Sequence, residues 1–119
     1  MAGNGCPRHS HIVSKPEIEW LDKLLIDKKY RHKSFKINNK RFNIDAFVVE
    51  TNTIYEFYGD YWHGNLKVFD KNSINPHTKK SYGYLFNKTI ERENFFRSAG
   101  YTVISMWEID WKREASSGK

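Results

Sequence analysis

The fold of this chain is organised around residues 41–58, which read RFNIDAFVVETNTIYEFY. Branched and aromatic side chains, which favour strands, fill both halves of this stretch. Thr51 and Asn52 separate the halves and are typical of turns. We therefore expect two strands, over 41–50 and 53–58, paired as an antiparallel hairpin.

Upstream of the hairpin, the sequence predicts a helix and a further strand. Ser14 and Glu17 have the spacing of a helix capping box. Four apolar residues then recur at helical spacing: Ile18, Leu21, Leu24 and Leu25. A first helix is therefore expected over 15–28. Residues 34–37 lead into an Asn-Asn turn at 38–39 and should form a strand.

Downstream of the hairpin, the sequence predicts a loop, a helix and a last strand. Gly, Asn and Pro recur through residues 59–82, which should be loop. A helix is expected over 84–98, ending at Gly100, followed by a short buried strand over 101–107. The order α-β-β-β-α-β predicts an α/β fold, with a mixed sheet flanked by helices.

The chain has 119 residues, enough for one compact domain, which we place at 14–113. Residues 1–13 are expected to be a flexible arm and residues 114–119 a disordered tail. No apolar stretch approaches the ~20 residues of a membrane span, so no membrane partner is expected. The single cysteine, Cys6, excludes an internal disulfide and predicts a reducing, cytoplasmic or intracellular location.

The charge pattern favours a polyanionic partner, because the net charge is +6 and 16% of residues are aromatic. Seven basic side chains and no acid lie between residues 28 and 41: Lys28, Lys29, Arg31, Lys33, Lys36, Lys40 and Arg41. Four acids and no Lys or Arg follow between residues 42 and 66: Asp45, Glu50, Glu56 and Asp60. Cations that bind phosphates beside carboxylates that bind a divalent metal would give this pattern. A solvated charged hairpin would give it too.

Hairpin geometry indicates which acids could share a metal ion. With an even-length turn centred on residues 51 and 52, Phe47 would face Glu56 and Asp45 would face Tyr58. Asp45 and Glu56 would then lie diagonally on one face, with β-carbons about 7–8 Å apart. An odd-length turn would place the two carboxylates on opposite faces.

Asp45 is an unusual residue for its position, because the strand around it is otherwise apolar. Aspartate is disfavoured in strands and is rarely buried without a partner. We interpret Asp45 as a functional residue. The alternative is a solvent-facing side chain on a strand that is buried on one side only.

The stretch at 55–65 reads YEFYGDYWHGN, with Asp45 upstream and GYTVISMWE at 100–108 downstream. Together these segments resemble the very-short-patch-repair endonucleases, and more closely their relatives among phage homing endonucleases, the EDxHD group. Both groups belong to the PD-(D/E)XK superfamily, and the resemblance covers about residues 14–111. It implies a restriction-endonuclease-like fold and a phosphodiesterase that depends on Mg²⁺, with Mn²⁺ as a substitute.

The resemblance also implies roles for individual residues. Asp45 matches the strand aspartate that ligates the metal, and Glu56 matches the acid of the (D/E)-X-K element. Phe57 matches the position whose backbone carbonyl can ligate metal, and Tyr58 stands where that element has its lysine. His63 matches the histidine that serves as general base on the attacking water. The other interpretation of His63 is a packed loop histidine.

Two further positions of the pattern are acidic. Glu17 matches the first-helix glutamate, although its capping role is an equal explanation. The final aspartate matches Asp70, with Asp60 nearby. The repair enzymes hold a structural zinc with cysteines near this loop, and the corresponding residues here include no cysteine. We therefore expect no structural zinc, and no functional metal at the Cys and His residues of the arm.

We expect a DNA endonuclease of homing or repair type that acts on double-stranded DNA, as a monomer or as a transient dimer on DNA. The basic residues of the 28–41 stretch are expected to contact phosphates. A phage or virus as source, with action inside the host cell, fits the resemblance. The alternative is an inactive nuclease-like module that only binds nucleic acid, which the missing lysine at Tyr58 keeps open.

Overall fold

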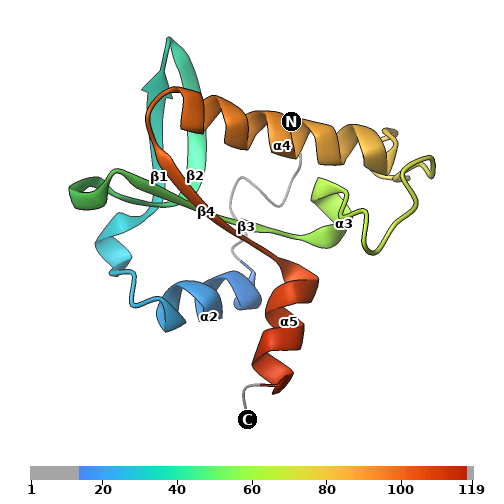
Figure 1. The fold of residues 1–119 in the computed structure, drawn as a ribbon, viewed down its shortest axis with the longest axis horizontal. Helices are drawn as coiled ribbons and strands as arrows, with labels where there is room; N and C mark the ends of the chain where they lie inside the picture. Colours follow the sequence, from blue (N-terminus) through green and yellow to red (C-terminus); the bar gives the residue numbers. More distant parts are fainter. Residues whose placement is uncertain (1–13, 118–119) are drawn as a thin grey trace.

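Four strands form one mixed sheet in the order β1-β2-β3-β4 within residues 14–117, the part of the chain that the structure describes (Figure 1). The structure is a computed structural model. Its strands are β1 Arg31–Ile37, β2 Lys40–Val48, β3 Thr53–Tyr58 and β4 Thr102–Trp107. Strands β1, β2 and β3 pair antiparallel, whereas β3 and β4 pair parallel. The expected α/β class with a mixed sheet is confirmed.

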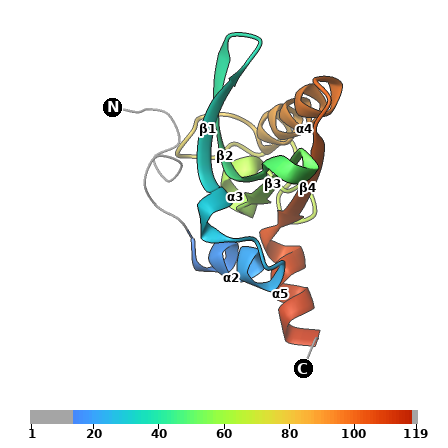
Figure 2. The same ribbon diagram turned by 90° about the vertical axis from the view of Figure 1, so that its left-hand side faces the viewer.

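Helices cover both faces of this sheet (Figures 1 and 2). They are α2 Lys15–Lys23, α3 Asp60–His63, α4 Tyr82–Ser98 and α5 Glu108–Ser117. One hydrophobic cluster joins the sheet to α2 and α5: Trp20, Leu21, Ile26, Ala46, Phe57 and Trp111. The other joins the sheet to α4: Ile37, Phe42, Ile44, Ile54, Phe96 and Val103. None of the helices in the described part of the chain has the length and apolar character needed to cross a bilayer.

The first helix begins as expected and ends early. The Ser14 hydroxyl accepts a hydrogen bond from the backbone N–H of Glu17 at 3.3 Å, which confirms the N-cap. The expected extent to residue 28 is wrong, because α2 ends at Lys23 and Leu25 adopts a φ of 60°. Leu25 is 89% exposed, so the chain turns away from the core there instead of completing the apolar stripe.

The β1–β2 turn confirms the expected hairpin. Ile37 pairs with Lys40, so the turn has two residues. Asn38 and Asn39 have φ of 52° and 66°, the conformation that two-residue turns require and that asparagine tolerates. Strand β1 begins at Arg31 and is longer than the expected segment 34–37.

The β2–β3 register differs from the expected one. Phe47 pairs with Ile54, and Ala46 pairs with Tyr55. The expected pairings of Phe47 with Glu56 and of Asp45 with Tyr58 are therefore wrong. The reason is a 3₁₀ turn at Val49–Thr51, which takes residues that we expected in the strand. The connection still has an even number of residues, and continuing the register by one position sets Asp45 across from Glu56 instead of diagonal to it.

Strand β2 changes the faces of its side chains at Asp45. Ile44 packs in the cluster under α4, Ala46 packs on the opposite face, and Phe47 packs again under α4. Strict alternation would put Ile44 and Phe47 on different faces. The residue opposite Asp45 on β1 is His32, which has a φ of 56°. The strand alternation is therefore interrupted at the position of the candidate catalytic aspartate.

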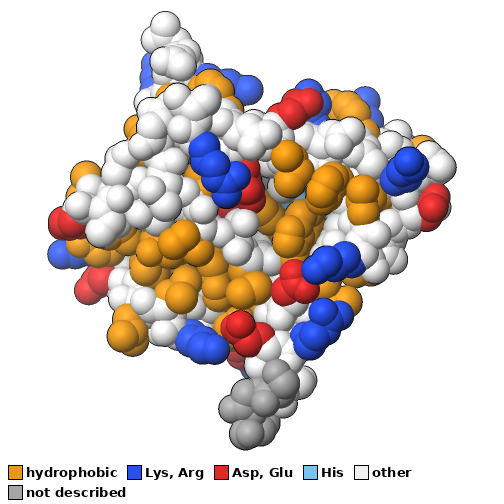
Figure 3. Space-filling view, in the orientation of Figure 1, with side chains coloured by type: hydrophobic (Ala, Val, Ile, Leu, Met, Phe, Trp, Pro, Cys, Tyr) orange, Lys and Arg blue, Asp and Glu red, His pale blue; other side chains and the backbone are white. Residues whose placement is uncertain are grey.

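The last strand and the last helix both differ from expectation. Strand β4 is not a buried strand, because it lies at the edge of the sheet and Ile104 is 42% exposed. Figure 3 accordingly shows hydrophobic side chains exposed across the middle of the molecule, with Lys and Arg around them.

The tail expected from residue 114 is helical as far as Ser117. Trp111 is buried, and Ala115 one turn later packs on the same cluster, so α5 has an apolar face to dock.

The segment between β3 and α4 is organised around Asn75, which is fully buried. Its side-chain N–H donates to the Tyr61 carbonyl at 2.9 Å. Its side-chain oxygen accepts from the backbone N–H of His77 at 2.8 Å and of Thr78 at 3.1 Å. This segment also contains α3, where we expected only loop. One amide therefore holds both halves of the segment that carries His63 into the site.

Asn75→Ala is expected to lower the free energy of unfolding by about 1–3 kcal/mol, because it leaves buried backbone groups without partners. Urea denaturation measures this change. Asn72→Ala, at an exposed position of the same segment, is the matched control and should change stability little. Equal stabilities of the two variants would contradict this account of the loop.

Candidate active site

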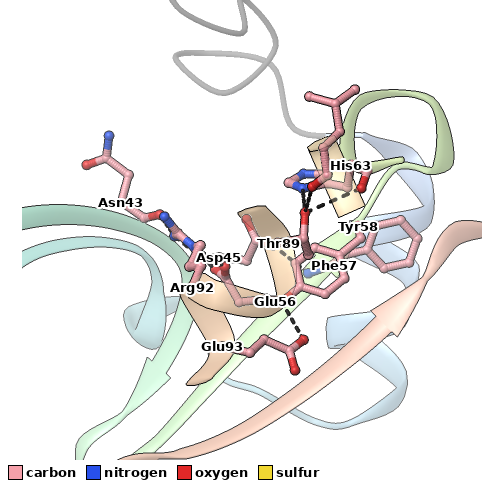
Figure 4. A network of polar contacts seen from close by, with 10 residues as sticks. Asn43, Asp45, Glu56, Phe57, Tyr58, His63, Thr89, Arg92 and Glu93 are labelled. Carbon is pink, nitrogen blue, oxygen red and sulfur yellow. Dashed lines mark hydrogen bonds and ion pairs between the residues drawn. The ribbon is translucent and has the colours of Figure 1, made fainter. Parts of the chain in front are cut away.

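The structure brings Asp45 and Glu56 together where β2 and β3 separate (Figure 4). The Asp45 carboxylate accepts a hydrogen bond from the backbone N–H of Phe57 at 2.6 Å. The backbone N–H of Asp45 in turn donates to the Glu56 carboxylate at 3.4 Å. Hydrogen bonds from side chains thus replace the backbone hydrogen bonds between β2 and β3 at this point. The two carboxylates lie together at this junction of the strands.

The backbone of Phe57 faces the same junction. In an extended strand, the N–H and C=O of one residue point toward the same neighbouring strand. The N–H of Phe57 points to Asp45, so its carbonyl is directed to that side as well. Regular pairing with β2 ends at Tyr55. The carbonyl oxygen of Phe57 and the carboxylate of Asp45 therefore lie on one side of β3, as a shared metal ligand set would require.

Arg92 of α4 compensates the charge of Glu56. Its Nε donates to one carboxylate oxygen of Glu56 at 2.8 Å, and its Nη2 lies 3.5 Å from the other. Nη2 also donates to the backbone carbonyl of Asn43 at 2.7 Å. Burial lowers the pKa of the guanidinium, but the charge and hydrogen bond of Glu56, together with the acidic groups of Tyr58 and Asp45, raise the net pKa. Glu56 is only 5% exposed, so this ion pair is what allows a charged carboxylate at that position.

Tyr58, which the sequence resemblance sets at a lysine position, carries no charge. It is 1% exposed, and its hydroxyl donates to the Glu93 carboxylate at 2.5 Å. Burial raises the pKa of this phenol, and the nearby Glu56 charge raises it further, so the hydroxyl stays protonated at neutral pH. The cation of the site comes instead from the neighbouring helix, at Arg92.

His63, at the end of α3, is held by Thr89 of α4. Its Nδ1 lies 3.1 Å from the Thr89 hydroxyl oxygen. That hydroxyl lies 3.0 Å from the Leu85 carbonyl one helical turn earlier, a bond that threonine commonly donates in helices. Once its one proton is donated to Leu85, Thr89 accepts from His63. This assigns the proton of the neutral ring to Nδ1 and the basic lone pair to Nε2.

The His63 ring also contacts the residue that adjoins the carboxylates. Its centroid lies 4.9 Å from that of Tyr58. Because Tyr58 follows Phe57 and Glu56 on β3, the contact places the imidazole beside the Asp45–Glu56 junction (Figure 4). The structure therefore groups four predicted site residues: Asp45, Glu56, Phe57 and His63.

The other three candidate acids make contacts of a different kind. Glu17 is buried, and its carboxylate lies 3.3 Å from Nε2 of His32. Asp60 accepts from the side-chain amide of Asn65 at 2.8 Å, and partial burial raises its pKa. Asp70 is exposed and accepts a backbone N–H within its own turn. The contact that the structure gives for Nδ1 of His63 comes from Thr89 and not from one of these acids.

The basic residues expected to contact phosphates divide into two groups. Arg31 donates to the Ile26 carbonyl and pairs with Asp22 at 2.8 Å, and Arg41 donates to the Ser34 hydroxyl. These two side chains are engaged within the fold. The lysines of the stretch are exposed: Lys28, Lys29, Lys33, Lys36 and Lys40.

Sequence reasoning missed the contribution of α4 to the site. Thr89, Arg92 and Glu93 all contact residues of the β3–α3 segment. Arg92 and Glu93 follow Thr89 by three and four positions, on the side of the helix that also carries the buried Phe96. The inward side of a helix is normally apolar. Polar residues at these positions of the expected helix could therefore have indicated that it contributes to a site.

The oxygen ligands at the β2–β3 junction suit a hard divalent cation. Mg²⁺ is usually bound by one or two carboxylates, with water and substrate phosphate completing its coordination. Asp45, Glu56 and the Phe57 carbonyl supply such a set. Within residues 14–117, no group of three or more His, Cys, Asp or Glu side chains is arranged to hold a metal. The donor set thus fits a partly hydrated Mg²⁺ and does not form a closed cage.

No protein-family model, curated protein or solved structure matches this chain. Its function is therefore inferred from the geometry of its own residues.

Arg92→Met is expected to lower the free energy of unfolding by about 1–3 kcal/mol, because it leaves the buried Glu56 carboxylate without its counter-charge. Glu56→Gln in the same chain should recover part of this loss, since the amide carries no charge. A double-mutant cycle measured by chemical denaturation gives the coupling between the two residues. Additive effects would show that the ion pair contributes nothing to stability.

Proposed function

We propose that this chain is a metal-dependent DNA endonuclease whose catalytic core is restriction-endonuclease-like. The observation that carries the proposal is the junction of β2 and β3, where Asp45, Glu56 and the Phe57 backbone meet beside a histidine of assigned tautomer. The combination of two carboxylates, a carbonyl and an oriented imidazole matches the parts that hydrolysis of a phosphodiester requires.

Asp45 and the Phe57 carbonyl would hold Mg²⁺ or Mn²⁺, with Glu56 as the further oxygen ligand. A bound divalent cation supplies polarisation of the scissile phosphate and stabilises the charge that develops in the transition state. Arg92 binds Glu56 through both carboxylate oxygens. The Arg92 side chain therefore limits how far Glu56 can turn toward a cation, and Asp45 is the principal ligand.

His63 would accept the proton of the attacking water at Nε2. Thr89 accepts a hydrogen bond from Nδ1 and so fixes the orientation of the imidazole ring. The basic Nε2 atom therefore keeps one direction. When Nε2 takes the proton, the imidazolium keeps its hydrogen bond to Thr89. The uncharged Tyr58 hydroxyl beside the ring adds no competing charge.

Double-stranded DNA is the substrate that the exposed lysines between residues 28 and 40 favour. Side chains of this kind bind phosphates without reading bases, and they position a duplex over nearby carboxylates. Residues 14–117 hold one such catalytic group, so cleavage of both strands would require a second copy in a transient dimer on DNA.

An inactive module that only binds nucleic acid is the second candidate. The Arg92–Glu56 ion pair favours it, because the guanidinium occupies oxygens that a metal ion would need. Such a module would need neither a metal ligand at Asp45 nor a proton acceptor at His63. Metal-dependent turnover therefore separates the two proposals.

Supercoiled plasmid incubated with the protein and Mg²⁺ or Mn²⁺ should be nicked or linearised, and EDTA should prevent this. His63→Ala is expected to lower the rate by about 10²–10⁴-fold, the contribution of a general base. Asp45→Asn should lower it at least as much through loss of the metal. Gel quantification of the supercoiled form measures each rate.

Two matched variants control for unspecific effects. His77→Ala removes another histidine of the same segment, and Asp27→Asn removes another carboxylate while keeping its capping oxygen. Both should cleave at the wild-type rate. Wild-type cleavage by His63→Ala would refute the role of the histidine, and metal-free binding without any cleavage would favour the inactive module.

A further inference from the structure

A second concave site lies on the α4 side of the sheet, at the end nearest the β2–β3 turn. Its volume is about 490 Å³, within the range of small-molecule sites. Eight residues line it: Lys29, Tyr30, Lys33, Ser34, Phe35, Phe47, Val49 and Tyr101. None of these residues takes part in the catalytic arrangement described above.

The floor of this pocket is aromatic. Phe35, Phe47 and Tyr101 contact one another, with ring centroids 5.1, 5.9 and 5.7 Å apart. All three side chains are only partly buried, so ring surface remains available to a ligand. Such a floor suits a flat aromatic group, because stacked and edge-on ring contacts add to the gain from burying apolar area.

The rim of the pocket is cationic and polar. Lys29 and Lys33 are exposed there, and Ser34 adds a hydroxyl. The Lys29 ammonium lies 5.1 Å from the Tyr30 ring centroid, so this lysine is directed along the rim. A purely apolar partner, such as a protein side chain or a lipid tail, would gain nothing from two ammonium groups. A flat ring linked to an anion uses both the floor and the rim.

The pocket is close to the candidate catalytic aspartate. Phe47 follows Asp45 by two positions on β2, which is about 6–7 Å along a strand. A lining residue of the pocket therefore lies within about the length of one nucleotide of Asp45.

We propose that this pocket binds one unstacked base of a DNA strand, with the base against Phe35, Phe47 and Tyr101 and its flanking phosphates on Lys29 and Lys33. The proposal extends the proposed function, since the bound strand is the one that reaches Asp45. It makes the protein selective for DNA in which a base can leave the stack, such as single-stranded, frayed or distorted sites. Any base can stack on aromatic side chains. The pocket therefore selects for a base that is unstacked, and not for a particular DNA sequence.

The test compares two DNA ligands in EDTA, where no cleavage occurs: a ten-nucleotide thymidylate strand and an abasic strand of the same length. Wild type should bind the thymidylate strand about tenfold more tightly, the gain expected from stacking one base. Phe35→Leu, which keeps the apolar volume and removes the ring, should abolish this preference. Fluorescence anisotropy of labelled strands measures both affinities.

A charge variant supports the test if Phe35→Leu fails to fold. Lys29→Ala with Lys33→Ala should weaken binding of both strands and reduce its salt dependence. Lys23→Ala with Lys112→Ala removes the same charge from α2 and α5 and should leave both affinities unchanged. Equal wild-type affinity for the two strands, or a base preference that survives Phe35→Leu, would overturn the proposal.

The two proposals fail in different ways. A base preference in EDTA without cleavage in Mg²⁺ would retain the pocket and overturn the endonuclease. Cleavage without a base preference would retain the endonuclease and overturn the pocket.

Discussion

The hydrogen bond from the Phe57 backbone to the Asp45 carboxylate is the constraint on which the rest of the site depends. A strand normally satisfies each backbone donor with a carbonyl of its neighbour. Here β2 stops pairing with β3 at Ala46, and the Asp45 carboxylate takes over as acceptor. The same interruption lets Ile44 and Phe47 both pack under α4. A polar side chain therefore closes a gap in the sheet, and the closure directs a carboxylate and a carbonyl to one place.

Helix α4 supplies what this junction lacks. Burying Glu56 would be costly without a counter-charge, and Arg92 provides one. Tyr58 adds a neutral, buried ring whose hydroxyl Glu93 holds. Thr89 of the same helix sets the tautomer of His63. One helix thus controls the charge at the carboxylates and the proton on the imidazole, which is why its inward side is polar where a purely structural helix would be apolar.

Local signals in the sequence predicted those features that depend on neighbouring residues. Ser14 as N-cap and the Asn38-Asn39 turn were predictable because each depends on contacts within about four residues. The proximity of Asp45 and Glu56 was also predictable. A β2–β3 connection of two or of four residues keeps both side chains on one face of the hairpin. The exact pairing was not predictable, because Val49, whose branched side chain favours a strand, instead begins a 3₁₀ turn. Arg92 lies 36 residues from Glu56 in the chain, and no local pattern encodes such a contact.

Metal binding tests the central claim most directly, because every proposed chemical role depends on Asp45 as a ligand. Mn²⁺ titration followed by electron paramagnetic resonance counts bound ions without requiring DNA or turnover. The account predicts Mn²⁺ binding by wild type that Asp45→Asn abolishes, whereas Glu56→Gln weakens it less. Equal Mn²⁺ binding by wild type and Asp45→Asn, or none by wild type, would contradict the assignment of this junction as a metal site.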